Sequence, residues 1–431
     1  MEAIIFLYRP SLPPSQVIVT VEREKVRRGL LTGLSTNVLI LGLVSLLTDA
    51  SSEMIYPILP LFLTGIGATG AVIGLIEGAA ETTASLLKVV SGRLSDKLGK
   101  RKPFLTSGYG LSTLAKPLLF LATSYWHVFA VRVTERVGKG LRSAPRDALI
   151  ADSTPEAHIG KAYGLHKAMD STGAVIGPLL VLPVLLTAAT VTTDTYRLIF
   201  LLATIPAALA VLVLFLFVKE PPKRAPRATG RMWKDARRLG RRFWALTLVV
   251  LIFFAGEISY SFFVLQSQAQ GMSTVTTILL YALFNVTFVI VSLPSGMLSD
   301  RIGRRPLLIL SFILFALTSL VMASATGLLL LALGFILYGV YKGTSEGAFK
   351  AFVIDLVPKD LRGTALGVYH TAVGLVMLPG GLVAGLLWDA AGAWGTFGYG
   401  IVMSVIALVL MLFLTRRGDR VIASSDSPGS P

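Results

Sequence analysis

Residues 92–103 read Gly92-Arg-Leu-Ser-Asp96-Lys-Leu-Gly99-Lys-Arg101-Lys-Pro103, and residues 296–306 read Gly296-Met-Leu-Ser-Asp300-Arg-Ile-Gly303-Arg-Arg305-Pro306. The two stretches share the pattern Gly-x-Leu-Ser-Asp-x-x-Gly-x-Arg at a separation of 204 residues (296 minus 92). Each copy follows a long apolar run and precedes another. A basic, glycine-punctuated loop at the same place in two halves of a hydrophobic chain indicates a duplicated protein that crosses a membrane.

The similarity between the halves extends beyond this loop. The matching positions, at an offset of 203 residues, are Lys139-Gly140 with Lys342-Gly343, Asp152 with Asp355, Pro155 with Pro358, Gly164 with Gly367 and Gly177 with Gly380. A drift of one residue over six apolar runs makes chance similarity an unsatisfactory explanation. Parallel repeats of this kind are related by an axis along the membrane normal, and their binding site lies between them near the midplane.

The composition is that of an integral membrane protein. Of the 431 residues, 54% are hydrophobic and only 15% are charged, whereas soluble domains carry about 25% charged residues. Apolar stretches long enough to cross a hydrocarbon core of ~30 Å recur along the chain. We expect twelve spans, at 36–64, 71–95, 104–123, 126–150, 160–186, 196–218, 243–268, 274–298, 306–325, 328–354, 362–388 and 393–415.

The net charge of +16 could indicate a nucleic-acid partner, but the distribution of Lys and Arg argues against one. Basic residues concentrate in alternate loops: 23–28, 97–102, 219–242, 301–305, 359–362 and 416–420. The opposite loops, such as 65–70, 266–273 and 389–395, contain no Lys or Arg. Because cytoplasmic loops of membrane proteins are enriched in positive charge, we expect a multi-pass protein of the cell membrane with both termini in the cytoplasm.

These features predict an all-α chain in five parts. They are a cytoplasmic extension at 1–33, a six-helix bundle at 34–218, a basic linker at 219–242, a second six-helix bundle at 243–415 and a cytoplasmic tail at 416–431. The linker is rich in Pro, Lys and Arg, so it is too charged to enter lipid.

Several classes of chemistry are excluded by what the sequence lacks. The chain has no cysteine, so disulfides and Cys-ligated metals are impossible. It contains no phosphate-binding Gly-x-x-x-x-Gly-Lys-Ser/Thr loop and no His-Glu-x-x-His zinc motif. We therefore expect no enzyme, no cofactor and no bound metal, and we expect an ion or solute gradient to supply the energy.

At this point the chain resembles a twelve-helix member of the major facilitator superfamily, over about residues 35–415. The repeated loop is similar to the most diagnostic motif of that family. The stretch from Arg132 to Gly140 is similar to its second motif, and Gly173-x-x-x-Gly177-Pro178 resembles the motif associated with antiporters, although Leu179 to Leu182 stand where antiporters usually have further glycines. The resemblance implies two pseudo-symmetric six-helix bundles, alternating access, a monomer surrounded by lipid, and export of a small solute.

The repeated loop is expected to gate the transporter. Gly92 allows close helix packing, Gly99 permits a tight turn, and Asp96 can pair with a basic group or accept hydrogen bonds from a helix N-terminus. In the family that this chain resembles, such contacts between the halves stabilise one of two access states. The candidate gating residues are Gly92, Asp96, Gly99 and Arg101, with Gly296, Asp300, Gly303 and Arg305 in the second copy. The alternative is a short loop with ordinary positive-inside charges.

Ionisable residues within the spans are the candidate transport groups, because charge at bilayer depth is costly unless it is paired or hydrated. Asp49 and Glu53 lie one helical turn apart, on the face that also carries the neighbouring Tyr56. Two such carboxyl groups in a low dielectric repel each other, so one of them can take up and release a proton. Structural pairing with a basic group of the fourth or fifth span, or a cation site, are the alternatives.

The fourth span carries an unusual number of charges. Arg132 and Arg136 share one face, and so do Glu135 and Lys139, which could neutralise each other. Arg136 lies near mid-span and needs a buried carboxylate, a hydrated cavity or an anionic substrate. Asp170, on the fifth span, could pair with Arg136 or Lys139. These basic residues favour an anionic or zwitterionic solute.

The second half contributes fewer charges and more aromatic residues. Its candidates are Glu257, Tyr260, Tyr338, Tyr341, Lys342 and Glu346. A tyrosine presents a flat apolar ring with a polar tip, which suits an organic solute but serves equally in helix packing. We therefore predict that the first half handles protons and solute charge, and that the second half shapes the organic part of the pocket.

Together these patterns predict a secondary active transporter that moves a small organic solute by alternating access, with proton-coupled export as the favoured mechanism. Proton symport or anion exchange is the alternative. Two other classes are less well supported. A receptor that binds without transport would need a signalling domain, and a membrane-embedded enzyme would need a catalytic constellation. The sequence shows neither feature.

Overall fold

The computed structural model describes residues 33–221, 235–358 and 361–425, with side chains as far as Leu414 apart from those of Leu293 and Asp300. Nearly all of the extension expected at 1–33, most of the linker expected at 219–242 and the end of the tail expected at 416–431 lie outside the described residues. The regular structure of the described part is helical.

The first half contains six helical passes. They are α2 (Thr36–Ile55) with α3 (Leu59–Gly65), α4 (Gly70–Leu98), α5 (Lys102–Ala115) with the 3₁₀ helix η1 (Lys116–Leu119), α6 (Tyr125–Asp152), α7 (Ile159–Thr187), which follows the 3₁₀ turn η2 (Glu156–His158), and α8 (Thr193–Phe217). Side-chain caps fix two of the starts, because Thr69 accepts the amide of Val72 and Ser124 accepts the amide of Trp126.

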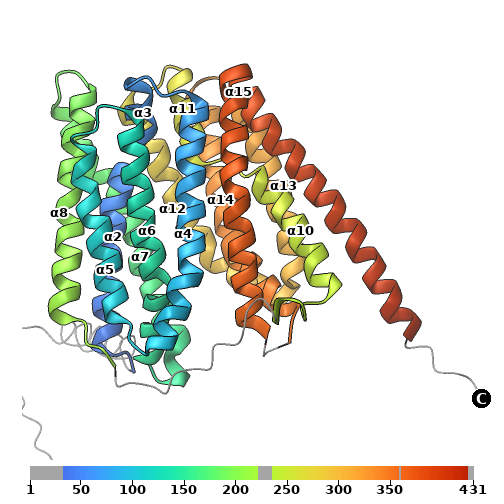
Figure 1. Ribbon diagram of the computed structural model, residues 1–431. Coiled ribbons are helices and arrows are strands. Elements are labelled where there is room, and N and C mark those ends of the chain that lie inside the picture. Colours follow the sequence, from blue (N-terminus) through green and yellow to red (C-terminus); the bar gives the residue numbers. More distant parts are fainter. Residues whose placement is uncertain (1–32, 222–234, 359–360, 426–431) are drawn as a thin grey trace, which may run out of the picture.

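The second half repeats this plan. Its helices are α10 (Arg241–Ala255) with α11 (Tyr260–Ala269), α12 (Thr274–Ile302), α13 (Arg304–Ala323), α14 (Gly327–Asp355) and α15 (Arg362–Ser425). The continuous α15 holds two passes, because Gly392 leaves the helical conformation with φ 59° and ψ −143°. Figure 1 shows the two arms of α15 diverging from that point.

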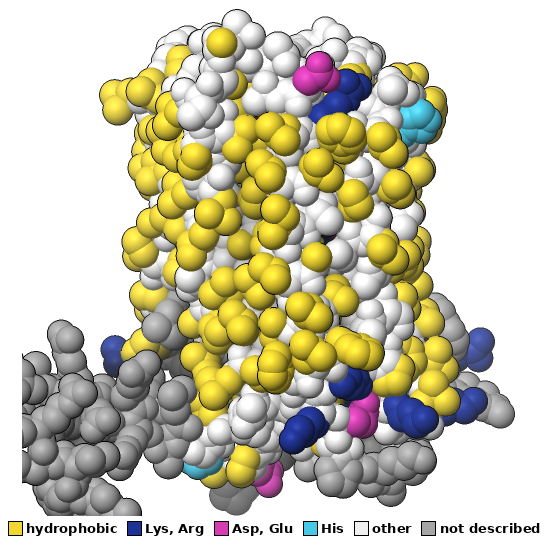
Figure 2. Space-filling view, turned by 90° about the vertical axis from the view of Figure 1, so that its left-hand side faces the viewer, with side chains coloured by type: hydrophobic (Ala, Val, Ile, Leu, Met, Phe, Trp, Pro, Cys, Tyr) yellow, Lys and Arg dark blue, Asp and Glu magenta, His cyan; other side chains and the backbone are white. Residues whose placement is uncertain are grey.

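Eight helical segments of the described chain are long and apolar enough to cross a membrane, and one of them, Arg362–Leu414, contains both passes of α15. The more polar α4, α5 and α6 stand beside them in the same bundle (Figure 1). If α2–α3 and α10–α11 each count as one pass and α15 counts as two, the described residues form twelve helical passes, the number that the sequence predicts. On the face shown in Figure 2, hydrophobic side chains cover the middle of the molecule and most Lys and Arg gather at its lower edge, as a lipid-embedded surface requires.

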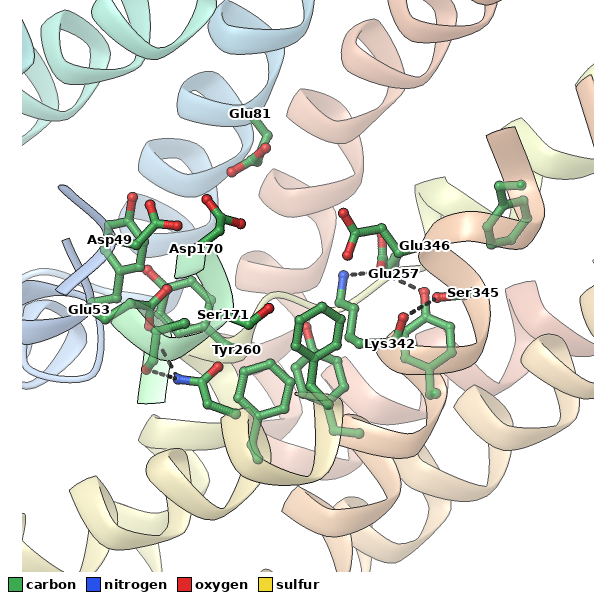
Figure 3. Close-up of a pocket in the computed structure, with 18 of the residues that line it drawn as sticks. Asp49, Glu53, Glu81, Asp170, Ser171, Glu257, Tyr260, Lys342, Ser345 and Glu346 are labelled. Carbon is green, nitrogen blue, oxygen red and sulfur yellow. Dashed lines mark hydrogen bonds and ion pairs between the residues drawn. The ribbon is translucent and has the colours of Figure 1, made fainter. Parts of the chain in front are cut away.

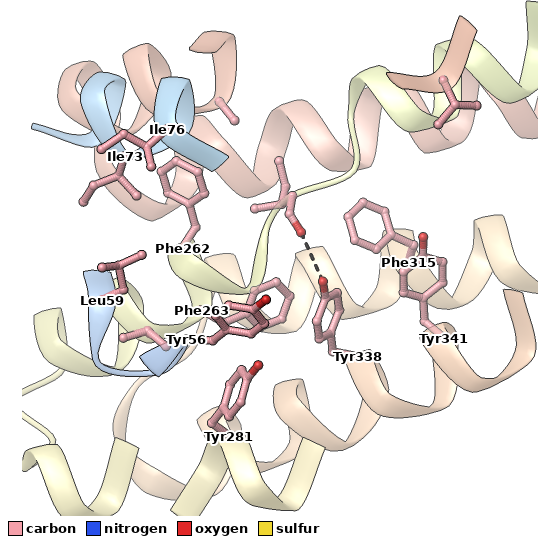
Figure 4. Packing of buried hydrophobic residues seen from close by; sticks show 14 of the residues in the cluster. Tyr56, Leu59, Ile73, Ile76, Phe262, Phe263, Tyr281, Phe315, Tyr338 and Tyr341 are labelled. Atoms are coloured by element: carbon pink, nitrogen blue, oxygen red, sulfur yellow. Dashed lines mark hydrogen bonds between the residues drawn. The ribbon is translucent and has the colours of Figure 1, made fainter. Parts of the chain in front are cut away.

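The first and seventh passes are broken near the middle. In the first, Tyr56 to Ile58 separate α2 from α3, where Pro57 and Pro60 limit regular hydrogen bonding. In the seventh, residues 256–259 separate α10 from α11, and tyrosines from other helices bond the freed carbonyls. Tyr399 donates to the Ala255 oxygen at 2.9 Å, and Tyr338 donates to the Ile258 oxygen at 3.5 Å (Figure 4). Backbone at membrane depth is tolerated in this form only when protein groups satisfy it.

The two halves meet along α4 with α15 and along α7 with α12. The α4–α15 contact is a glycine seam, because a Cβ atom on Gly78 would lie 2.7 Å from the Met377 carbonyl oxygen, and Gly74 and Gly381 pack backbone to backbone. At the N-terminal end of α4, the Asp389 carboxylate accepts hydrogen bonds from the backbone amides of Gly70 at 2.6 Å and Ala71 at 2.9 Å. The halves are therefore closed at the end opposite the basic loops.

Candidate functional site: a cavity between the halves

A cavity of about 480 Å³ lies between the two halves and is lined by α2, α4, α6 and α7 on one side and α10, α11, α12, α14 and α15 on the other. Its charged lining residues are Asp49, Glu53, Glu81, Arg136, Lys139, Lys167, Asp170, Glu257, Lys342, Glu346 and Lys350. A second cavity of about 470 Å³ shares six of these residues and extends to Lys88, Arg142 and Arg146 toward the basic loops. The central cavity therefore continues toward the basic side.

Three carboxyl groups form one wall of the cavity. Asp49 and Glu53 come from α2 and Asp170 from α7, and Figure 3 shows them together, opposite Glu257 and Lys342. The antiporter-like glycines allow this arrangement, because a Cβ atom on Gly177 would lie 2.6 Å from the Glu53 Cβ. Gly173 in the same way packs against the α2 backbone at Leu46, and Pro178 follows as the next residue of α7.

Glu53 reaches across to the second half. Its Oε2 accepts a hydrogen bond from the Tyr281 hydroxyl at 2.8 Å and another from the Asn285 amide nitrogen at 3.3 Å. Asn285 also donates to the Ala174 carbonyl oxygen at 3.0 Å, so it contacts both α2 and α7. Among the residues that the structure describes, Glu53 forms no ion pair.

Arg132 does not line the central cavity. Its side chain is fully buried, with 0% of the residue exposed, and it pairs with Glu77 of α4 at 3.1 Å and Glu135 of α6 at 2.7 Å. The ring of Tyr56 covers the guanidinium at 4.8 Å. Glu135 therefore neutralises Arg132 rather than Lys139.

Arg136 finds a carboxylate in Glu81 of α4, at 3.1 Å. Asp170 pairs with Lys167 of its own helix at 3.4 Å, and not with Arg136 or Lys139 as the sequence suggested. The physical reason is that α4 and α6 pack against each other with Glu77 and Glu81 spaced like Arg132 and Arg136, so two cross-helix pairs form in register.

Lys116 and Lys139 of the first half each lack an acidic partner within 4 Å in the described part of the chain. Lys139 lines both cavities. Lys116 has only 1% of its surface exposed, and its ammonium contacts the hydroxyls of Ser51 at 2.6 Å and Ser52 at 3.1 Å. Lys116 thus anchors α2 through its serine hydroxyls, inside the first half. Lys139 lines the cavity, where a solute can reach it.

In the second half, Glu257 sits at the break of the seventh pass. Its Oε1 accepts Tyr341 at 2.6 Å and Lys342 at 2.5 Å, while its Oε2 has no hydrogen-bond partner in the described structure. Lys342 therefore pairs with Glu257 instead of Glu346, its neighbour one turn along α14. Glu346 contacts Lys350, and at 3.7 Å it also reaches Lys167 of the first half.

A series of aromatic rings lines the cavity from one half to the other, and Figure 4 labels three of them, Tyr56, Tyr281 and Tyr338. Successive ring centroids are 5.8 Å apart for Tyr56 and Tyr260, 5.6 Å for Tyr260 and Tyr281, 5.5 Å for Tyr281 and Phe284, and 4.9 Å for Phe284 and Tyr338. From the sequence we did not predict Glu81, Tyr281, Phe284 or Asn285 as site residues. The available signal was that Glu81 and Asn285 are polar residues inside apolar spans.

The repeated loop builds equivalent contacts in both halves. Arg101 pairs with Asp96 at 2.6 Å, donates to Ser95 at 2.7 Å and reaches Asp152 at 3.5 Å. In the second half, Arg304 donates to Ser299 at 2.9 Å and reaches Asp355 at 3.5 Å.

Arg304 thus takes the place of Arg101, although the sequence pattern aligns Arg305 with it. The second loop has one residue fewer between its glycine and its proline, which shifts the register by one. The side chain of Asp300 lies outside the described residues.

The glycines of these loops differ in their constraints. Gly99 ends α4 at φ 61° and ψ 26°, and Gly303 has φ 87°, a conformation that disfavours any other residue. A Cβ atom on Gly92 would lie 3.1 Å from Ala144, whereas Gly296 has open space around it. Close helix packing therefore constrains Gly92 and not Gly296.

Comparison with known proteins identifies the family. The profile of the Major Facilitator Superfamily matches residues 41–291 and 258–429. An uncharacterized MFS-type transporter of Methanocaldococcus jannaschii is 38% identical over 388 residues, which cover 88% of this chain and 95% of that protein. The multidrug resistance protein MdtH of Proteus mirabilis is 29% identical over 128 residues, 30% of this chain and 32% of that protein.

The crystal structure of the D323A mutant of the nucleoside transporter NupG superposes with a TM-score of 0.75 at 14% identity, covering 88% of this chain and 99% of that chain. At that identity the likeness concerns the fold alone. The chain belongs to the Major Facilitator Superfamily. It is a multi-pass membrane transporter of the kind that carries small solutes, and not an enzyme.

Proposed function

We propose that this protein is a secondary active transporter that exports a small organic solute in exchange for protons. The observation that carries the proposal is the carboxyl wall of Asp49, Glu53 and Asp170, which lines the same central cavity as the aromatic series and contacts it where Tyr281 donates to Glu53. Carboxyl groups in a cavity can bind a proton on one side of the membrane and release it on the other. The relative named for multidrug resistance adds support for export.

Within this proposal the two halves have different tasks. Asp49, Glu53 and Asp170 carry the proton, and Lys139 balances their charge. The aromatic series holds the organic body of the solute, and the pair of Glu257 and Lys342 offers a second polar contact at the far wall. Arg132 and its two carboxylates keep α4 and α6 together and do not touch the solute.

The same proposal places the protein in the cytoplasmic membrane as a monomer, with the two bundles at 34–218 and 243–415 in contact with lipid. The basic loops, and with them both chain ends, face the cytoplasm. The central cavity would then open inward in this structure, because the halves meet at the opposite end.

Flux measurements test the proposal. Purified protein in liposomes, given an imposed pH gradient, is presented with solutes of cationic, anionic, zwitterionic and neutral type. We expect accumulation of at least one solute against its gradient, and we expect the Asp49→Asn/Glu53→Gln double variant to lose this pH-driven accumulation while it still exchanges solute down its gradient. Asp194→Asn is the matched control, because that carboxylate has 80% of its side chain exposed and pairs only with Arg197 among the described residues. Undiminished pH-driven accumulation in the double variant would reject the proposal.

Proton symport or anion exchange is the second candidate, and Lys139 favours it as a cavity cation without an acidic partner within 4 Å in the described chain. The same liposomes separate the two. Antiport moves solute toward the acidic compartment and symport moves it away, whereas anion exchange does not respond to the pH gradient unless a counter-anion is present.

A further inference from the structure

Glu53 is a charged link between the halves that uses only neutral partners. Its Oε2 accepts both Tyr281 and Asn285 of α12, while Asn285 also bonds to the backbone of α7. We call Glu53, Tyr281 and Asn285 the Glu53 bridge. It lies beside the contact of α7 with α12, one of the places where the halves touch.

The strength of this bridge depends on whether Glu53 holds a proton. The amide nitrogen of Asn285 can only donate, so it needs an oxygen with free lone pairs. An ionised carboxylate provides these, and hydrogen bonds to an ionised group are about twice as strong as those between neutral groups. A proton on Oε2 would point toward the Asn285 N–H, and a proton on Oε1 would leave Oε2 a weaker acceptor.

Other charged groups act on Glu53 from the surrounding helices. They are Asp49 on its own helix α2 and Arg136 and Lys139 on α6. The phenol of Tyr56, just after α2, also interacts with Glu53, and Asp170 of α7 and Tyr260 of α11 line the same cavity. Arg136 is engaged by Glu81, and Asp170 by Lys167. Tyr281 and Asn285 are therefore the groups that bond Glu53 directly from the other half.

We propose that Tyr281 and Asn285 are the residues that couple protonation to the access state. They hold α12 to α2 in the state closed opposite the basic loops while Glu53 is ionised, and they release it when Glu53 binds a proton. The inference rests on the proposed function, because a proton exchanger needs its proton site to favour one access state over the other. Tyr281 and Asn285 act through Glu53 and are positioning residues.

Because the chain has no cysteine, single introduced cysteines report the access state without background. Ala384→Cys lies on the α4–α15 seam, where the native residue has 2% of its surface exposed, and it becomes reactive when that seam opens. Ser143→Cys lines the cavity on the basic side. The ratio of the two rates with N-ethylmaleimide cancels the intrinsic pH dependence of the thiol.

The decisive variant is Tyr281→Phe, which removes one hydroxyl. Where Glu53 is ionised, we expect it to raise the ratio of Ala384→Cys to Ser143→Cys labelling by about tenfold, the usual effect of losing a hydrogen bond to a charged group. In acid, where Glu53 is protonated, the effect should shrink to about twofold or less. Asn285→Leu should behave in the same way, and in a Glu53→Gln background the effect of Tyr281→Phe should be small at every pH.

Tyr196→Phe is the matched control. Its hydroxyl also joins the halves, through Thr274 at 3.1 Å, but it involves no carboxylate. We expect its effect on labelling to be the same in acid and base. The inference is overturned if Tyr281→Phe changes the labelling ratio equally at both pH values, or not at all. If the Asn285→Leu variant does not fold, the Tyr281→Phe comparison still decides.

Labelling and flux can fail separately. The labelling experiment needs no solute, so a pH-dependent effect of Tyr281→Phe in a protein that shows no pH-driven flux would reject proton exchange and keep the Glu53 bridge as a conformational contact. Normal pH-driven flux combined with a pH-independent Tyr281→Phe effect would reject the bridge and keep proton exchange.

Discussion

Arg132 illustrates how a charge can be kept inside a membrane bundle. The guanidinium has no exposed surface, and Glu77 and Glu135 flank it from two helices. The phenol of Tyr56 lies close to Glu135, at 3.4 Å, and its ring covers the guanidinium. Desolvating one cation and two carboxylates is costly, so this cluster is stable only while all three members are present.

We expect Arg132→Met to destabilise the fold by about 3–5 kcal/mol, because it leaves two buried carboxylates without their cation. Thermal unfolding in detergent measures the loss, and adding Glu77→Gln to Arg132→Met should recover part of it. Arg197→Met is the control, since that arginine pairs with the exposed Asp194 and such pairs contribute about 1 kcal/mol or less. Equal unfolding temperatures for Arg132→Met and Arg197→Met would contradict this account.

The sequence shows which residues need a partner, but not which partner they obtain. Arg136 was expected to require a carboxylate, a hydrated cavity or an anion, and it obtains Glu81. The choice depends on the faces that α4 and α6 turn toward each other, and periodicity does not specify those faces across 55 residues of chain. The partners of Glu53 were even harder to predict from the sequence, because they lie on α12 and depend on how the two halves pack together.

At the scale of elements, α7 shows why small residues matter in a membrane bundle. Without a hydrophobic force between helices in lipid, close approach requires backbones with no side chain between them. Gly173 and Gly177 face α2, whereas Gly160 and Gly164 of the same helix have open space around them. The antiporter-like glycines therefore bring the Asp170 side of α7 against the Glu53 side of α2.

We expect Gly177→Ala to destabilise the protein by about 1–3 kcal/mol, because the added methyl group would overlap the Ala50 carbonyl and the Glu53 Cβ. Transport should slow as well, since Glu53 would move away from Tyr281 and Asn285. Gly164→Ala adds the same methyl group to the same helix in open space, and it should leave both stability and flux unchanged. Unfolding and flux that were identical for the two variants would show that the close approach is unimportant.

The positions of the helices were largely predictable because each apolar run has the length of a membrane span. Pro57 and Pro60 lie where the first pass breaks, although we predicted an unbroken span at 36–64. The break at 256–259 was not predictable, because no proline marks it and its carbonyls are satisfied by Tyr338 and Tyr399, far along the chain. A break of this kind depends on tertiary contacts that local sequence does not contain.

For the whole molecule, duplication gives both halves the same arrangement of helices but different buried side chains. Arg101 and Arg304 bind equivalent partners at the basic end of each half. Ion pairs join Glu77 to Arg132 and Glu81 to Arg136 in the first half, and the aromatic series lies mostly in the second. The sequence predicted this division, since titratable residues and aromatic residues are already separated between the halves. Alternating access then requires the two halves to move against each other at their contacts.

The N-terminal end of α4 offers a direct way to stop the movement of one half against the other. Asp389 of the second half caps the first two amides of α4, with its carboxylate 2.9 Å from the Ala71 nitrogen. Within the first half, Glu220 caps α5 in the same manner, with its carboxylate 2.7 Å from the Lys102 nitrogen. The two caps are chemically alike, but only the first one joins the halves.

We expect the cysteine pair Ala71→Cys/Asp389→Cys to lose transport when oxidised and to regain it when reduced, because the disulfide holds the α4–α15 seam closed and prevents the second access state. The reduced form of the same protein is its own reference for the loss of the Asp389 cap. The pair Lys102→Cys/Glu220→Cys should form a disulfide inside one half and leave flux unchanged by oxidation. Because the native chain has no cysteine, any change on oxidation belongs to the introduced pair. Continued flux through the fully oxidised Ala71→Cys/Asp389→Cys protein would mean that solute passes without opening this seam, and the two halves would then not alternate as rigid bodies.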